Sequence, residues 1–214
     1  YIDPASVTQA IARGARMRGA AIYENTSVTS ITVDGRRCTH VHTDAGATIE
    51  CEIVVNAAGM WGMEVGRMVG ARVPAVAVEH QYLLSGPIEG YTPVEIGQMP
   101  TMRDPDHLVY YKPDGPGLLV GGYEPDTVAF GVDADIPSPF QRRLFDPDFD
   151  RFAQLAELAQ KRTPVLEAAG IRNLINGAIP YSADADFVMG KAPELDNFFL
   201  ATGFHGLHVT GGLI

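Results

Sequence analysis

Two stretches of the chain decide the fold: Ile53-Val54-Val55-Asn56-Ala57-Ala58-Gly59-Met60-Trp61 and Phe198-Phe199-Leu200-Ala201-Thr202-Gly203-Phe204-His205-Gly206. In each, a short apolar run typical of a strand ends in small residues, after which a helix can begin. Such turns let backbone N–H groups approach a ligand closely, and a helix N-terminus favours negative charge. Two of them predict two strands that end at one crevice, the usual ligand position in an open α/β sheet. The alternative is two buried strands that merely end in tight turns.

The composition is that of a globular protein, and it excludes several classes of function. Of the 214 residues, 46% are hydrophobic and 20% are charged, and the net charge is −10. An acidic chain without clustered Lys and Arg is not expected to bind nucleic acid. No apolar run approaches the roughly 20 residues that cross a bilayer, so no membrane partner is expected. Cys38 and Cys51 are too few for a disulfide framework or a structural zinc site, and they favour a reducing, cytoplasmic location.

The two ends of the chain indicate a piece of a longer protein. The chain begins at Tyr1 rather than at Met, and it stops at Ile214 just after Gly211-Gly212. A strand, a glycine-rich turn and an incipient helix are not expected to make a natural terminus.

Local patterns predict a helix followed by a β-meander in the first third of the chain. Asp3-Pro4 is typical of an N-cap with proline at the first helical position, and Gly19 is typical of a helix end. Asp34-Gly35 between two β-prone runs predicts a hairpin. The expected elements are a helix to residue 18, strands at 20–24, 27–33, 39–43 and 49–56, and a helix at 61–69.

The remainder of the chain predicts an antiparallel sheet with one helix. Residues 113–117 form a second hairpin turn. Residues 124–147, rich in proline and aspartate, predict a long surface loop. Residues 148–162 have the pattern of an amphipathic helix that buries Phe149, Phe152, Leu155 and Ala159. The expected strands cover residues 76–85, 107–112, 118–123, 171–182, 187–190 and 198–202.

These elements predict an α/β (α+β) fold in which one domain interrupts another. Residues 1–72 are interpreted as part of a nucleotide-binding, Rossmann-like domain, and residues 183–214 as the return to it, cut short. Residues 73–182 are interpreted as an inserted antiparallel-sheet domain that covers the substrate. Such an insertion places the ligand at the interface of the two domains.

The whole chain resembles the FAD-dependent oxidoreductases of the D-amino-acid oxidase superfamily, above all the sarcosine and dimethylglycine dehydrogenases. The resemblance runs in order through all 214 residues. No GxGxxG fingerprint is present, so the resemblance implies that the family's dinucleotide-binding loop lies N-terminal to this piece. The segments that carry it, besides the two turns, are Val78-Glu79-His80-Gln81-Tyr82, Val109-Tyr110-Tyr111, Leu118-Leu119-Val120-Gly121-Gly122-Tyr123-Glu124 and Ile171-Arg172-Asn173-Leu174-Ile175-Asn176-Gly177.

The resemblance implies that FAD is the cofactor and assigns residues to it. Val28 corresponds to the backbone at the adenine, and the first turn to the segment that packs on the ADP portion. The last turn corresponds to the segment that faces the flavin ring. The cofactor-binding set is therefore Val28, Ala57, Ala58, Gly59, Trp61, Gly203, Phe204, His205, Gly206 and Leu207. The resemblance also implies a small-molecule amine substrate, a folate-binding domain in the full-length protein, and the mitochondrial matrix as the location in a eukaryote.

Two segments near the implied flavin depart from the family's pattern. Tyr181-Ser182-Ala183-Asp184-Ala185-Asp186 stands where relatives tend to have Thr-Pro-Asp-Gly. Phe204-His205-Gly206 stands where relatives often have Asn and Ser before the His-Gly pair. These two differences affect which residues contact the flavin and which substrate is bound.

His80, Tyr110 and Tyr111 are the candidate catalytic residues. Amine oxidation by a flavin requires a neutral nitrogen, and histidine is the side chain best suited to exchange a proton near pH 7. Adjacent strand residues point to opposite faces, so at most one of the two tyrosines faces a site with His80. The alternative for His80 is a hydrogen-bonded structural role. A substrate carboxylate would need a cation or a phenol, and Arg103, Lys112 and Arg172 are equal candidates for the cation.

Three functions follow for comparison with the structure. The first is oxidation of a secondary or tertiary amine of the sarcosine or dimethylglycine kind. The second is another activity of the superfamily, such as oxidation of a D-amino acid or of glycerol 3-phosphate. The third is a non-catalytic subunit that retains the FAD-binding fold. The electron acceptor and the covalent state of the flavin stay open, and no metal site is expected.

Overall fold

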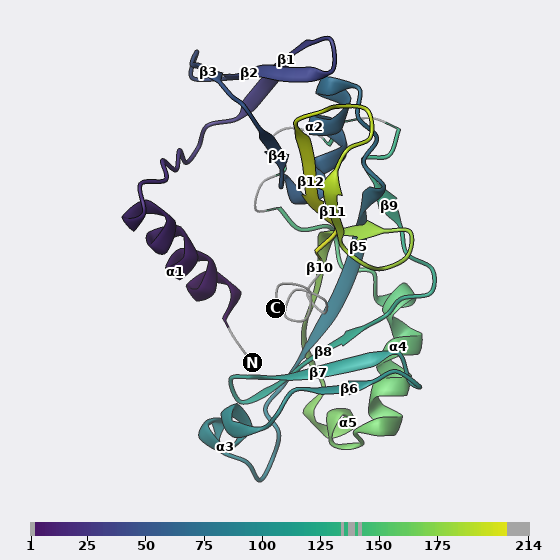
Figure 1. Ribbon diagram of the computed structural model, residues 1–214. Coiled ribbons are helices and arrows are strands. Elements are labelled where there is room, and N and C mark those ends of the chain that lie inside the picture. The colour runs from purple at the N-terminus through teal and green to yellow at the C-terminus, as the bar shows by residue number, and fades with distance from the viewer. Residues whose placement is uncertain (1–2, 134, 137–139, 141–142, 205–214) are drawn as a thin grey trace.

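The computed structural model describes residues 3–133, 135–136, 140 and 143–204, which form three β-sheets and a set of helices (Figure 1). This arrangement confirms the mixed α/β class that the sequence predicts. Within these residues, no helix has both the length and the apolar character that spanning a bilayer requires.

The elements follow one another along the chain with few long connections. The helices are α1 (Pro4–Met17), the 3₁₀ turn η1 (Gly59–Trp61), α2 (Gly62–Val69), α3 (Pro93–Gln98), α4 (Phe149–Arg162) and α5 (Val165–Ala169). The strands are β1 (Val28–Asp34), β2 (Arg37–Thr43), β3 (Thr48–Glu50), β4 (Val54–Asn56), β5 (Ala75–Ser85), β6 (Met102–Asp104), β7 (Val109–Asp114), β8 (Gly117–Gly122), β9 (Ala129–Phe130), β10 (Ile171–Ser182), β11 (Val188–Lys191) and β12 (Phe198–Thr202).

The two strands that end in small residues lie next to each other. β12 pairs with β4 in parallel, with Phe198 opposite Val54 and Leu200 opposite Asn56. Parallel neighbours end at the same edge of their sheet, so the turn after β4 and the turn after β12 are adjacent. The predicted meeting of the two strand ends is therefore confirmed.

A buried asparagine joins the first and last parts of the chain. Asn197, 3% exposed, precedes β12, and its side-chain oxygen accepts a hydrogen bond from the Cys38 N–H at 2.8 Å. Its amide nitrogen donates to the carbonyl oxygens of Cys38 and Glu52, both at 2.8 Å. Ile31 and Phe198 belong to one buried cluster around this clamp. The domain boundaries at residues 72 and 182 stay predictions, although this cluster draws on both outer segments.

The large sheet has the strand order β10-β5-β8-β7-β6, with β9 also paired to β5. β5 and β10 pair over nearly their whole lengths, from Ser85 opposite Ile171 to Ala75 opposite Ser182. α4 packs on one face of this sheet through Phe152, Leu155 and Ala159, which are buried as predicted. Gly122 of β8 makes this packing possible, because a Cβ atom there would overlap the side chain of Leu155.

Two predicted strands are wrong. Residues 20–24 form no strand, because no other strand pairs with them within the described chain, and Glu24 instead forms an ion pair with Arg16 at 2.8 Å. The predicted strand 49–56 is two strands, β3 and β4. The chain leaves the sheet of β1 and β2 after β3 and joins β12 at Val54. Intrinsic β-propensity does not show where a chain changes its partner strand.

The predicted surface loop at 124–147 contains more structure than expected. β9 lies in it and pairs with β5. Phe130, Phe140 and Phe145 pack together, with ring centroids 4.9–5.2 Å apart. Phe149, predicted to face the core, is 56% exposed, because it is the first residue of α4 and follows the N-cap Asp148 directly.

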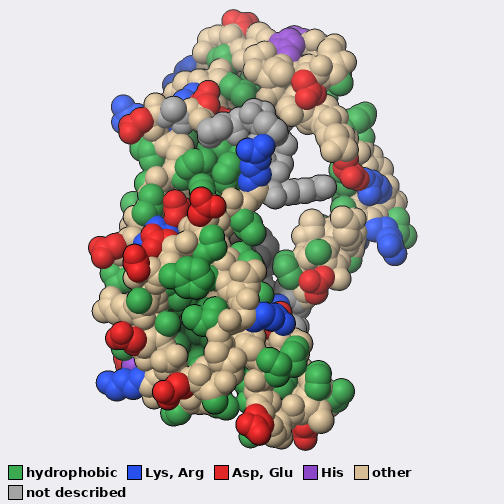
Figure 2. All heavy atoms as spheres, turned by 180° about the vertical axis from the view of Figure 1, so that it is seen from behind, with side chains coloured by type: hydrophobic (Ala, Val, Ile, Leu, Met, Phe, Trp, Pro, Cys, Tyr) green, Lys and Arg blue, Asp and Glu red, His purple; other side chains and the backbone are tan. Residues whose placement is uncertain are grey.

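Helix α1 stands away from the body of the molecule, as the space-filling view shows (Figure 2). Asp3 caps it as predicted, since its carboxylate accepts a hydrogen bond from the Ser6 N–H at 2.8 Å. None of its described residues is buried, and Ile11 is 68% exposed. Its local sequence therefore forms the helix without burying any of its described residues.

Asn197→Ala should lower the free energy of unfolding by about 2–5 kcal/mol, because it leaves buried backbone groups of Cys38 and Glu52 without partners. Denaturant unfolding of the full-length protein measures this. Asn173→Ala is the matched control, because Asn173 is exposed on β10. Equal losses in the two variants would contradict a clamping role for Asn197.

Candidate active site

A cavity of about 440 Å³ opens on the face of the large sheet that α4 leaves free. Successive residues of β5 point to opposite faces. The Gln81 side chain exchanges two hydrogen bonds with the backbone of Asp148 at the start of α4, so His80 lies on the other face. The residues around the cavity that matter below are Val78, His80, Tyr82, Tyr110, Tyr123 and Glu124.

His80 and Tyr110 meet across the sheet at this cavity. The Nε2 atom of His80 lies 2.9 Å from the Tyr110 hydroxyl, and the two rings are nearly parallel with centroids 6.1 Å apart. Burial raises the pKa of the Tyr110 hydroxyl far above its usual range, and the nearby Tyr123, Glu124 and Tyr82 act in the same direction. Tyr110 therefore keeps its proton at neutral pH and is able to donate it in a hydrogen bond to His80.

Gly121 makes the contact between His80 and Tyr110 possible. β8 lies between β5 and β7, and Gly121 pairs with Tyr82 on one side and with Tyr110 on the other. A Cβ atom on Gly121 would overlap the phenol ring of Tyr110. The missing side chain thus lets the ring of Tyr110 lie across β8 and reach β5.

Tyr111, the third candidate, does not reach the cavity. It is 4% exposed in the core between the sheet and α4, and its hydroxyl donates to the Ala159 carbonyl at 3.2 Å. The alternation of adjacent strand residues, anticipated from the sequence, selects Tyr110. We therefore leave Tyr111 out of the candidate site.

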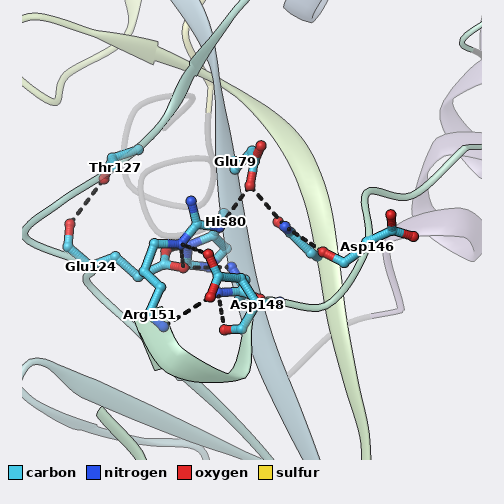
Figure 3. A network of polar contacts seen from close by, with 9 residues as sticks. Glu79, His80, Glu124, Thr127, Asp146, Asp148 and Arg151 are labelled. Atoms are coloured by element: carbon cyan, nitrogen blue, oxygen red, sulfur yellow. Dashed lines mark hydrogen bonds and ion pairs between the residues drawn. The ribbon is translucent and has the colours of Figure 1, made fainter. Parts of the chain in front are cut away.

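A buried polar network lies behind His80 (Figure 3). The Glu124 carboxylate, whose side chain is 3% exposed, lies 3.1 Å from His80 Nδ1 and accepts the Gln81 N–H at 3.1 Å. Arg151 of α4 approaches Glu124 to 4.0 Å and pairs with Glu79 at 2.7 Å. Both ring nitrogens of His80 thus have partners, which fixes the plane of the ring.

The structure sets Arg172 apart from the other two cations that the sequence left equal. Arg172 forms an ion pair with Asp114, away from the cavity residues. Arg103 of β6 pairs with Tyr110 of β7, and its guanidinium lies 5.6 Å from the centroid of the Tyr123 ring. Burial raises the pKa of the Tyr123 hydroxyl, while the adjacent Arg103 opposes that rise. Lys112 lies on β7, two residues beyond Tyr110.

A second cavity, of about 690 Å³, brings together several residues of the predicted cofactor set. Residues from β1, from the turn after β4 and from α2 line it. Gly59 has a φ of +55°, in the left-handed region, and no atom lies within 4 Å of the position of a Cβ atom there. The predicted residues on its wall are Val28, Ala57, Ala58, Gly59 and Trp61.

Asn56 shapes the turn that borders this second cavity. Its side chain donates to the Gly62 carbonyl at 2.8 Å and accepts the Ala58 N–H at 3.2 Å. Thr202 at the end of β12 donates to the Gly59 carbonyl at 3.1 Å. The small-residue turn is therefore held by side chains from both parallel strands.

The last predicted turn is described only at its start. Gly203 has a φ of +75°, and the ring of Phe204 stacks on that of Phe187 with centroids 4.9 Å apart. His205, Gly206 and Leu207 lie outside the described residues.

Sequence reasoning missed Glu124, Tyr123 and Gly121 as parts of the first cavity. Their common signal was the run Gly121-Gly122-Tyr123-Glu124, in which two small residues on opposite faces of one strand precede two polar ones. One glycine makes room for Tyr110 and the other for Leu155. The spacing of Glu124 from His80 along the chain contains no signal, because only the pairing of β5 with β8 joins them.

Comparison with known proteins agrees with this architecture. The chain is 40% identical to the mitochondrial sarcosine dehydrogenase of Mus musculus, over 99% of this chain and 23% of that protein. It is 35% identical to the mitochondrial dimethylglycine dehydrogenase of the same organism, over 100% of this chain and 25% of that protein. The crystal structure of L-proline dehydrogenase from P. horikoshii matches with a TM-score of 0.74 and 24% identity, covering 95% of this chain and 50% of that chain.

The chain thus spans about a quarter of the length of these two curated relatives. The family model described as FAD dependent oxidoreductase (DAO) matches residues 1–213. With the paired strand ends and the observed sheets, this match shows that the chain belongs to the DAO family of FAD-dependent oxidoreductases.

Proposed function

We propose that the protein containing this chain oxidises a secondary or tertiary N-methyl amine of the sarcosine or dimethylglycine kind. The observation that carries this proposal is the His80–Tyr110 pair, which has a hydrogen bond of 2.9 Å at the wall of a cavity of about 440 Å³. A cavity of that size suits a small amine. The names of the two mouse relatives support the substrate class.

The second cavity supports a place for the ADP portion of FAD. Its wall is mostly small and apolar, with Glu64 as its one charged side chain among the described residues, and it leaves open backbone at Gly59. There the left-handed conformation and the absence of a Cβ atom allow a close approach. Val28, Ala57, Ala58, Gly59 and Trp61 would hold that portion. We propose Gly203 to Leu207 for the flavin end. When bound, the flavin accepts the hydride from the C–H bond beside the substrate nitrogen.

His80 and Tyr110 would move the substrate's proton. An amine is largely protonated at neutral pH, and hydride leaves only from the neutral form. The ammonium proton passes to the Tyr110 oxygen while the Tyr110 proton passes to His80 Nε2, so the charge ends on the imidazole. Histidine is suited to this role because its charge changes near neutral pH.

Arg103 is our choice for the substrate carboxylate. Its guanidinium lies 5.6 Å from the ring centroid of Tyr123, which lines the cavity, and none of the ion pairs found among the described residues involves it. An arginine binds a carboxylate in a bidentate manner that fixes its orientation.

By their names, the two mouse relatives are mitochondrial proteins. We therefore propose the mitochondrial matrix as the location of the protein if its source is a eukaryote. We also propose that the full-length protein has a folate-binding domain beyond this chain.

The decisive experiment is a titration of the full-length, FAD-loaded protein with sarcosine and dimethylglycine while the flavin absorbance is recorded. Bleaching by either amine supports the proposal. Bleaching by a D-amino acid or glycerol 3-phosphate alone indicates another activity of the family, and no bleaching by any of them indicates a non-catalytic subunit.

Dimethylamine, which lacks the carboxylate, should bind more weakly than sarcosine, and Arg103→Met should remove that difference in affinity.

His80→Ala should slow flavin reduction by about 10²–10⁴-fold at saturating amine, because the proton acceptor is lost. Stopped-flow absorbance measures the rate, and the flavin content is determined on the same sample. His107→Ala is the control, since His107 pairs with Asp104 at 2.9 Å on the edge strand β6. An unchanged rate in His80→Ala with normal flavin content would assign His80 a structural role.

Gly121→Ala should slow flavin reduction by about tenfold or more, because the new methyl group displaces the Tyr110 ring from His80. Stopped-flow rates and a crystal structure of the variant measure the two effects. Gly97→Ala in α3 is the control, since no atom lies within 4 Å of a Cβ atom there. A wild-type rate with Tyr110 displaced would show that the His80–Tyr110 contact is not used.

A further inference from the structure

We propose that Glu124 is a positioning residue that holds the proton of neutral His80 on Nδ1 and thereby leaves Nε2 free to accept a proton from Tyr110. The effect of this proton position on amine oxidation rests on the proposed function. The tautomer of His80 itself can be measured whether or not the protein oxidises an amine.

The two oxygens of Glu124 have separate tasks. Oε1 accepts the backbone N–H of Gln81 at 3.1 Å, which ties the carboxylate to β5. Oε2 lies 3.1 Å from His80 Nδ1. Glu124 itself lies in the connection after β8, but Gln81 follows His80 directly, so this hydrogen bond holds the carboxylate beside the imidazole of the same strand.

The chemistry of these groups determines where the proton lies. An ionised carboxylate accepts hydrogen bonds and donates none, so His80 must donate from Nδ1. A neutral imidazole has one N–H, and its Nε2 is then an acceptor. Burial raises the pKa of the Tyr110 hydroxyl, so Tyr110 is protonated and donates to Nε2. The hydrogen bonds therefore all run in one direction, from Tyr110 through His80 to Glu124.

The surroundings support a charged carboxylate behind the histidine. The Glu124 side chain is 3% exposed, and Arg151 of α4 faces it with Nε at 4.0 Å from Oε1. Arg151 is itself held by Glu79 at 2.7 Å and by Asp148 at 3.9 Å. When His80 takes up the substrate's proton, its positive charge lies between Glu124 and Tyr110. A buried negative charge at hydrogen-bond distance stabilises that imidazolium.

Glu124→Gln reverses the direction of these hydrogen bonds without changing the shape of the side chain. The amide oxygen still accepts the Gln81 N–H, so the amide NH₂ group faces His80 Nδ1 and donates to it. Nδ1 becomes the acceptor, the proton moves to Nε2, and Nε2 no longer accepts from Tyr110. Flavin reduction at saturating amine should fall by about 10²-fold or more, as expected when a catalytic histidine has the wrong tautomer.

The first measurement is the tautomer of His80 in the full-length, FAD-loaded protein, read from the infrared bands of ring-labelled histidine. The His80→Ala variant identifies the bands of His80. We expect a proton on Nδ1 in the wild type and on Nε2 in Glu124→Gln. A proton on Nε2 in the wild type would overturn the inference without any variant, so the test does not depend on the folding of Glu124→Gln.

The second measurement is the pH dependence of flavin reduction. Several titratable or charged groups face His80 or its partners. They are Tyr82, Tyr110, Tyr123, Glu124 and Tyr181 at the cavity, Arg103 over Tyr123, and Arg151, Glu79 and Asp148 behind Glu124. Loss of the Glu124 charge disfavours the imidazolium, so the acid limb of the profile should move to lower pH in Glu124→Gln. Asp104→Asn is the matched control, because Asp104 at the end of β6 pairs with His107 in the turn that follows and should leave that limb in place.

These outcomes separate the inference from the proposed function. A wild-type rate in His80→Ala contradicts the proposed proton transfer, whatever the tautomer of His80. A slow His80→Ala variant together with an unchanged tautomer and an unchanged acid limb in Glu124→Gln contradicts the role of Glu124 alone.

Discussion

The pairing of β5 with β10 and β8 is the constraint on which the rest of the structure depends. Because the side chains of a strand alternate, that pairing sends Gln81 to α4 and His80 to the cavity. It also places β8 beside β5, so Tyr110 crosses over Gly121 to reach His80. A shift of one residue in this register would exchange the core face and the cavity face together. Core packing and the candidate site are therefore fixed by the same hydrogen bonds.

The first cavity combines burial with complete hydrogen bonding at its central residue. His80 has a partner at each ring nitrogen, and one of them, Glu124, is tied to the backbone of the same strand. Burying a carboxylate is costly unless its oxygens are bonded, and here Gln81, His80 and Arg151 surround it. Such a network holds the imidazole in one orientation, which is what a group that exchanges protons requires.

The second cavity depends on a different constraint, the parallel pairing of β4 with β12. That pairing brings turns from opposite ends of the chain to one sheet edge, and Asn197 ties the same region together through the backbone of Cys38 and Glu52. Side chains of Asn56 and Thr202 then hold the small-residue turn open. Ala57, Ala58 and Gly59 of this turn contribute little side-chain bulk to the cavity wall, and the residues behind them supply the rigidity.

The sequence by itself determined most of the local elements, the small-residue turns, the hairpins at Asp34-Gly35 and 113–117, and the rule that only one of Tyr110 and Tyr111 faces a site. It also carried the resemblance to the FAD-dependent oxidoreductases, because that information lies in residue order. Only the tertiary structure decided which tyrosine faces the cavity, that residues 49–56 divide between two sheets, and that Glu124 stands behind His80. These depend on which strands pair, and hydrogen bonds between distant segments leave no periodic signal in the chain.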